Sequence, residues 1–81
     1  MSIHEYVAAL GRVTATLHAA AASTDTALRE LTAARAILTR LSPDGAGWYP
    51  AELDLAIAEL TKAAELAAGA RELVADYMMR L

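Results

Sequence analysis

LSPDGAGWYP, residues 41–50, is the stretch that decides the fold, because it holds both prolines and two of the four glycines of an 81-residue chain. Proline lacks the backbone N–H that a helix needs, and glycine readily takes the positive φ that turns need. We therefore expect one helix to end at about residue 41 and the chain to reverse over residues 42–49. A second helix then begins at Pro50, since proline is favoured at the first helical position.

A seven-residue apolar repeat precedes this turn. Ser2 and Glu5 form a capping box at its start, so the helix should begin at once. The two seam positions of each heptad are Ile3, Leu10, Leu17, Thr24, Leu31 and Leu38, followed three residues later by Tyr6, Val13, Ala20, Ala27, Ala34 and Leu41. This repeat predicts a single helix over residues 3–41. Thr24 either sets the register of the seam or bonds a carbonyl of its own helix.

A second seam follows the turn, at Leu53, Leu60, Ala67, Val74 and Leu81. Glu52 and Asp54 complement the positive end of the helix macrodipole, which favours a helix start near Pro50. Gly69 weakens this helix without shifting the phase of the seam. The pattern predicts a helix over residues 50–81.

Two long helices joined by a short link must lie antiparallel, which predicts an all-α fold, a two-helix hairpin in one domain of residues 1–81. Counting outward from the turn places Leu31 level with Ala63, and Ala20 level with Val74. The first helix is the longer by roughly ten residues at 1.5 Å each. Its first turns, with Ile3, Tyr6, Val7 and Leu10, should therefore overhang the end of the second helix.

The hairpin should need a partner. A lone core in a chain of this size stabilises folding by only a few kcal/mol. Leu28, Ile37, Leu66 and Leu73 also widen each apolar stripe beyond what one helix can cover. We expect the hairpin to dimerise into a four-helix bundle, with itself as a homo-oligomer or with a related helical hairpin. The predicted partner interface is Ile3, Tyr6, Val7, Leu10, Leu28, Leu66 and Leu73, with Trp48 and Tyr49 at the tip.

Trp48 is the only tryptophan, and it lies in the turn. One interpretation makes Trp48 and Tyr49 a structural plug that caps the core beside Leu41 and Leu53, because a buried aromatic adds much apolar area. A second makes Trp48 an exposed anchor for a partner protein, since tryptophan is enriched at binding hot spots. A third is stacking on a ligand.

Composition argues against several classes of function. The net charge is −3 and the pI about 5.2, with scattered basic residues, so we expect no nucleic-acid partner. No apolar run approaches the ~20 residues of a membrane span, and there is no cysteine for disulfides or thiolate metal sites. No cleavable signal is visible. We expect a cytoplasmic protein, or one exported with a partner by a route independent of a signal peptide.

No residue pattern indicates catalysis, a cofactor or a metal. His4 and Glu5 could open an HExxH motif, but Ala8 stands where the second histidine is required. We therefore expect a non-catalytic interaction module. The alternative is a small helical enzyme that binds an anionic substrate through arginines, as in the all-helical chorismate mutases. Its basic residues would be Arg12, Arg29, Arg35, Arg40 and Lys62, although Asp25 and Arg29 also read as an ordinary surface i,i+4 pair.

The Gly47-Trp48 turn between two long helices resembles the small WxG-type helical-hairpin proteins of type VII secretion. The alanine-rich composition and the ending Tyr77-Met78-Met79-Arg80-Leu81 are similar to actinobacterial hairpin domains found alone or ahead of toxin domains. The order here is Gly-Trp-Tyr rather than Trp-x-Gly, and Leu81 stands where the family has an acid four residues after its tyrosine. The resemblance implies a secretion-associated partner or chaperone that forms homo- or heterodimeric four-helix bundles, with any export signal carried by the partner.

Overall fold

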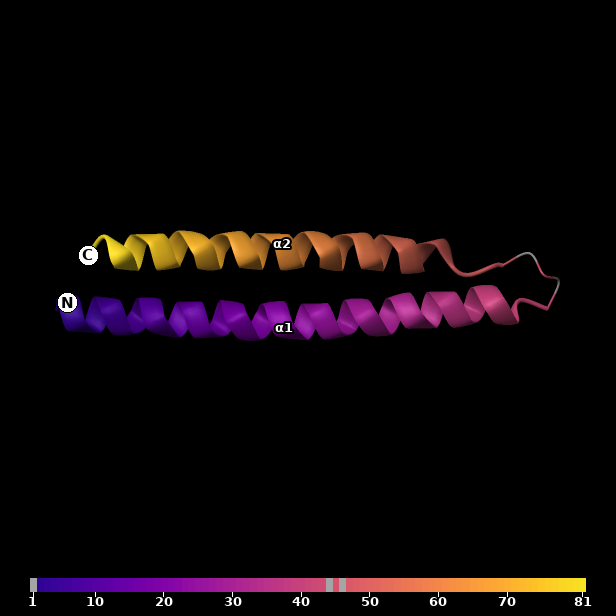
Figure 1. The fold of residues 1–81 in the computed structure, drawn as a ribbon, viewed down its shortest axis with the longest axis horizontal. Helices are drawn as coiled ribbons and strands as arrows, with labels where there is room; N and C mark the ends of the chain where they lie inside the picture. The colour runs from indigo at the N-terminus through magenta and orange to yellow at the C-terminus, as the bar shows by residue number, and fades with distance from the viewer. Residues whose placement is uncertain (1, 44, 46) are drawn as a thin grey trace.

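The computed structural model describes residues 2–43, 45 and 47–81. Helix α1 (Ile3–Leu41) and helix α2 (Ala51–Met79) lie side by side and antiparallel, with both termini at one end (Figure 1). The predicted all-α hairpin is confirmed, and the helix bounds agree with the prediction to within two residues. The molecule is a rod of 64 × 16 × 14 Å.

Local interactions explain where α1 begins and how the turn leaves it. The Ser2 hydroxyl accepts a hydrogen bond of 3.1 Å from the Glu5 backbone N–H, as a capping residue should. Gly45 and Gly47 have φ of +71° and +70°, values that residues with a Cβ rarely adopt. A Cβ on Gly47 would also lie 3.2 Å from Thr39 Cγ2, so the returning backbone packs closely on α1. Residues 44 and 46 of the predicted turn lie outside the described residues.

The predicted register of the two helices is wrong by at least five residues. Its alignment would set Arg35 level with Glu59, whereas Arg35 Nη1 lies 2.9 Å from Asp54 Oδ1. A contact of 2.7 Å between His18 Nδ1 and Arg71 Nη1 shows the same offset. The cause is the non-helical segment that precedes α2 and runs back beside α1 (Figure 1). An extended residue advances about 3.3 Å, against 1.5 Å for a helical one, so α2 starts further along α1 than a residue count suggests.

The predicted overhang at the N-terminus is therefore also wrong. The rings of Tyr6 and Tyr77 pack edge to face, with centroids 6.1 Å apart, so the end of α2 reaches the first turns of α1. Leu10 is part-buried, while Ile3 remains 59% exposed and Val7 37% exposed. The extra length of α1 lies mainly at the turn, beside residues 47–50 (Figure 1).

The contact face of α1 keeps the seven-residue repeat at Leu10, Leu17, Thr24 and Leu31, but its second part-buried row lies four residues after each of these rather than three. Val13 and Ala20, predicted in the seam, are exposed, and Thr14 and Ala21 take their places. Thr24 donates a hydrogen bond of 2.8 Å to the Ala20 carbonyl, the second of the two roles expected for it. The part-buried residues of α1 are Tyr6, Ala9, Leu10, Thr14, Leu17, Ala21, Thr24, Ala27, Leu28, Leu31, Ala34 and Arg35, so Ala27 and Ala34 of the predicted seam are part-buried as well.

The seam is a line of contact and not a closed core. Among the described residues, no side chain of either helix is fully buried. Natural domains of this size rely on a buried apolar core, or on staples such as disulfides, metals or association. The chain has no cysteine. The apolar surface left open on the hairpin is thus the feature that bears on function.

Candidate interaction surface

The hairpin has two long flanks, one on each side of the seam. The central seam residues are Leu10, Leu17, Thr24 and Leu31 in α1, and Leu53, Leu60, Ala67 and Val74 in α2. Residues that stand three positions after a seam residue, or one position before it, lie on one side of the helix. Residues that stand one or four positions after a seam residue lie on the other side. Because the helices are antiparallel, like positions of both helices share a flank. The Tyr6 and Tyr77 rings join two positions of the first kind, while Arg35–Asp54 and His18–Arg71 join positions of the second.

The second flank is polar, and we call it the polar flank; its cross-helix contacts are the two just named. Arg35 and Asp54 form an ion pair of 2.9 Å whose side chains are 35% and 49% exposed. Tyr49 donates a hydrogen bond of 2.9 Å to Asp54 Oδ2. These contacts fix the start of α2 against α1 and hold the segment before it. The hydrogen-bonding side chains of the polar flank are Thr14, His18, Arg35, Thr39, Asp54, Thr61 and Arg71.

The hydrogen bonds of Asp54 shift two pKa values in opposite directions. Donation from Arg35, and then from Tyr49, lowers the pKa of Asp54 below its ordinary value. The same carboxylate, by accepting from the hydroxyl, raises the pKa of Tyr49. Both shifts favour the charge states of neutral pH, so the cluster is a positioning device for the turn.

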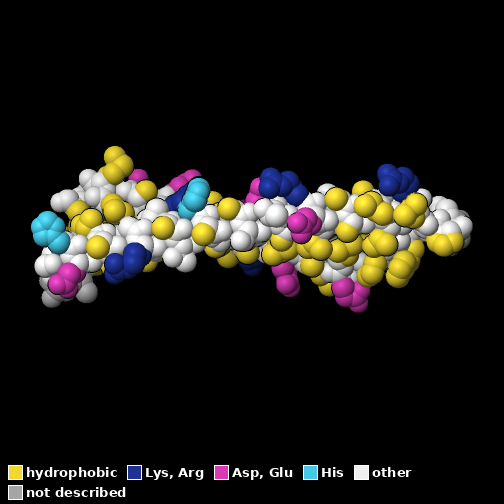
Figure 2. Space-filling view, turned by 90° about the horizontal axis from the view of Figure 1, so that it is seen from below, with side chains coloured by type: hydrophobic (Ala, Val, Ile, Leu, Met, Phe, Trp, Pro, Cys, Tyr) yellow, Lys and Arg dark blue, Asp and Glu magenta, His cyan; other side chains and the backbone are white. Residues whose placement is uncertain are grey.

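The other flank carries apolar side chains in both halves of the hairpin. Alanines of both helices lie along it, at Ala20, Ala27, Ala34, Ala56, Ala63 and Ala70. Large side chains project between them, with exposures from 45% at Ile37 to 72% at Leu73. We call this surface the apolar flank and define it by its large exposed residues, which are Val13, Ile37, Leu41, Leu66, Leu73 and Tyr77. Figure 2 shows hydrophobic side chains in a broad band along the lower edge, over the half nearest the turn.

Acids border the apolar flank in one half only. The rows one residue before the seam hold Glu30, Glu52 and Glu59 in the half nearest the turn. In the half nearest the termini the same rows carry no acid, and consist of Ala9, Thr16, Ser23, Leu66, Leu73 and Arg80. In Figure 2, two acidic side chains project from the band of hydrophobic atoms. The two halves of the apolar flank therefore differ in the charge along their borders.

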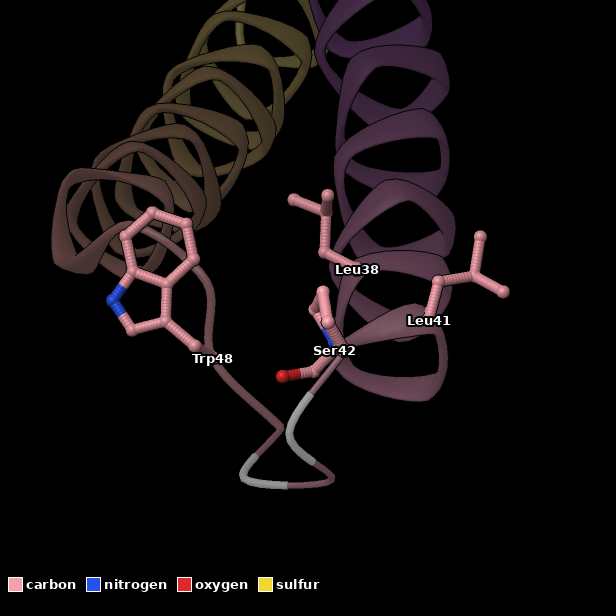
Figure 3. A pocket seen from close by; sticks show the side chains of 5 residues that line it. Leu38, Leu41, Ser42 and Trp48 are labelled. Carbon is pink, nitrogen blue, oxygen red and sulfur yellow. The ribbon is translucent and has the colours of Figure 1, made fainter.

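The turn end carries a shallow cleft beside Trp48. Its volume is about 500 Å³, and Leu38, Leu41, Ser42, Pro43 and Trp48 line it. Leu38 projects from α1 toward the space between the helices, and Trp48 lies across from it on the side of α2 (Figure 3). Trp48 is 67% exposed, so the predicted plug is wrong for the single hairpin. The backbone of Gly47 packs against Thr39, and this contact leaves the indole outside the seam.

The structure divides the predicted interface residues among different surfaces. Tyr6, Leu66 and Leu73 lie on the apolar flank, whereas Val7 and Leu28 are on the side of the polar flank. Leu10 lies in the seam, Ile3 at the exposed start of α1, and Trp48 and Tyr49 beside the turn. The predicted interface omitted four apolar-flank residues, Val13, Ile37, Leu41 and Tyr77, although Ile37 was expected to lie beside the seam. Each of them stands three positions after a seam residue or one position before it, and this spacing could have identified them from the sequence.

The basic residues of the alternative enzyme hypothesis do not converge on a cleft lined by described residues. Arg29 pairs with Asp25 at 2.9 Å on the exposed surface, and Arg35 pairs with Asp54 on the polar flank. A second shallow hollow includes Arg29, but its other lining residues all come from α1, at Leu28, Thr32, Ala33 and Ala36. Among the described residues, no three His, Cys, Asp or Glu side chains lie close enough to share a metal ion.

Neither helix, over the described residues, combines the length and apolar character that crossing a membrane requires. Comparison of the chain with protein-family models, with curated proteins and with solved structures finds no match. The interaction surface is therefore interpreted from its own geometry.

Proposed function

We propose that this protein is a non-catalytic interaction module, a helical hairpin that pairs with a second hairpin, its own copy or a related chain, to form a four-helix bundle. The observation that supports this most strongly is the lack of any fully buried side chain among the described residues, together with the apolar flank. Exposed apolar surface of this extent marks protein interaction sites. Pairing would supply the buried core that the single hairpin lacks.

We extend the proposal to a biological setting, that of a secretion-associated partner or chaperone. The resemblance of the Gly47-Trp48 turn to WxG-type hairpin proteins supports this setting. The exposed Trp48 at the tip offers such a partner an aromatic anchor of the kind enriched at hot spots. Co-expression with a candidate secreted partner, followed by assay of both chains in the culture medium, tests this part of the proposal.

A double substitution tests the proposed pairing itself. Leu10→Asp and Leu66→Asp place one carboxylate in the seam and one on the apolar flank, where each would be buried without a partner charge in a four-helix bundle. We expect a monomer of low helix content by sedimentation and circular dichroism. Leu55→Asp is the control, because Leu55 is 63% exposed on the side of α2 opposite the seam. A well-folded, unchanged oligomer of the double variant would contradict the proposal.

A further inference from the structure

We infer that the apolar flank is covered by a second copy of this chain, with the two hairpins antiparallel, so that the turn of each copy lies beside the termini of the other. This inference rests on the proposed function and specifies the occupant and its orientation. Two features of the apolar flank carry it, namely the exposed area and the distribution of charge.

The first feature is area. The hairpin exposes 6010 Å², whereas a folded monomer of 8.5 kDa is expected to expose about 4,700 Å² from the scaling of surface with mass. The excess is about 1,300 Å² per chain. Obligate homodimers bury roughly 1,000 Å² or more on each partner. The hairpin thus exposes in excess about the area that one protomer contributes to a stable dimer, and a small ligand would cover far less.

The second feature is charge. A parallel pair would set Glu30, Glu52 and Glu59 of one copy against the same three acids of the other, and like charges facing across an interface oppose association. An antiparallel pair instead sets this acidic half against the half whose border rows hold uncharged residues and Arg80. The charge pattern therefore favours one of the two twofold arrangements.

Distances between spin labels on cysteines test the arrangement, because the chain has no cysteine of its own. Arg40→Cys puts a label near the turn, sixteen residues beyond Thr24, which is about 24 Å along the helix. If the twofold axis crosses the hairpins near Thr24, the two labels of an antiparallel dimer lie about 50 Å apart. In a parallel dimer they lie within the width of a four-helix bundle, roughly 20 to 25 Å. Thr26→Cys, near the middle, is the control, since it gives the shorter distance in both arrangements.

The outcomes separate this inference from the proposed function. A dimer with Arg40→Cys labels about 50 Å apart supports both. A dimer with labels near 20 Å overturns the antiparallel arrangement and leaves the proposed function standing. A monomer of low helix content overturns self-pairing but agrees with a module that needs a different chain. A fully helical monomer overturns both.

Neutralising the three glutamates gives a second test, because the dissociation constant of the dimer should fall in one arrangement and not in the other. The variant with Glu30→Gln, Glu52→Gln and Glu59→Gln removes repulsion from a parallel dimer, whose dissociation constant should fall. In an antiparallel dimer it removes an attraction or nothing, so the constant should stay unchanged or rise a few-fold. A fall of tenfold or more would overturn the inference.

Discussion

Leu66 and Leu55 provide a matched pair for testing the role of the apolar flank. Both are leucines of α2 with nearly the same exposure in the hairpin, 65% and 63%. Leu66 lies on the apolar flank, whereas Leu55 lies two residues from Leu53 and so points away from the seam. Substitution of either by alanine preserves helix propensity, since alanine is the best helix former. A difference between the two variants therefore reports on association.

The magnitude follows from the exposed fraction. Full burial of a leucine side chain is worth about 1.5 to 3 kcal/mol, and roughly two-thirds of Leu66 remains to be buried, so each copy loses about 1 to 2 kcal/mol on truncation. A twofold dimer contains two copies, which gives about 2 to 4 kcal/mol, or roughly a 30-fold to 1,000-fold rise in the dissociation constant. Leu55→Ala should change it only a few-fold, as surface substitutions shift free energies by about 0.5 kcal/mol.

Sedimentation equilibrium over a range of concentrations measures both dissociation constants, and circular dichroism at the highest concentration checks that both variants are helical. Equal effects of Leu66→Ala and Leu55→Ala would refute the assignment of the interface to the apolar flank. So would a Leu66→Ala variant whose dissociation constant matches that of the unsubstituted chain.

Three further predictions concern the turn and the polar flank. Gly47→Ala should lower the thermal unfolding midpoint more than Gly45→Ala, because both sites have positive φ but only Gly47 lacks room for a Cβ; equal shifts would contradict the close packing. The lowered pKa of Asp54 means that its pair with Arg35 stabilises the fold above about pH 4 and that this stability is lost as the pH falls through the folded-state pKa; Asp54→Asn should therefore flatten the acid limb of stability against pH in urea titrations, and an unchanged limb would count against the pair. Trp48→Ala should have the same helix content by circular dichroism as the unsubstituted chain at the same high dilution, since the indole is exposed in the single hairpin. A lower helix content of the variant would show that Trp48 caps the contact between the helices.

The ends of both helices could be predicted from sequence because local chemistry fixes them. Ser2 supplies the cap of α1, and the prolines and glycines of residues 41–50 stop one helix and start the next. Gly69 lies within α2 without ending it, as the undisturbed phase of the apolar repeat across Gly69 suggested. Each of these features depends on neighbours within a few residues.

The register was not predictable in the same way, because it depends on the backbone path of residues 47–50. Counting residues treats the link as if it advanced at a helical rate, and the error displaced the Arg35–Asp54 and His18–Arg71 pairs by five residues and the Tyr6–Tyr77 pair by more. The cluster of Arg35, Tyr49 and Asp54 was missed for this reason, as was the contact between the rings of Tyr6 and Tyr77.

The exposed apolar surface was predictable from stripes that are too wide for one helix to cover, but its position was predictable only in part. Leu66 and Leu73 were identified correctly as lying beside the seam. Val13 was assigned to the seam because the second seam row was placed three residues after the first, whereas Thr14 and Ala21, four residues after it, are the part-buried ones. That change of row moves Val13 and Ala20 from the seam to the apolar flank.

Sedimentation equilibrium of the unsubstituted chain, with helix content followed by circular dichroism over the same dilutions, tests the central claim most directly. We expect a stable dimer or a larger species at high concentration, and a loss of helix content as dilution dissociates it, because the single hairpin buries no side chain fully among its described residues. A fully helical monomer at every concentration would contradict the account, since the hairpin would then be stable with its apolar flank in water.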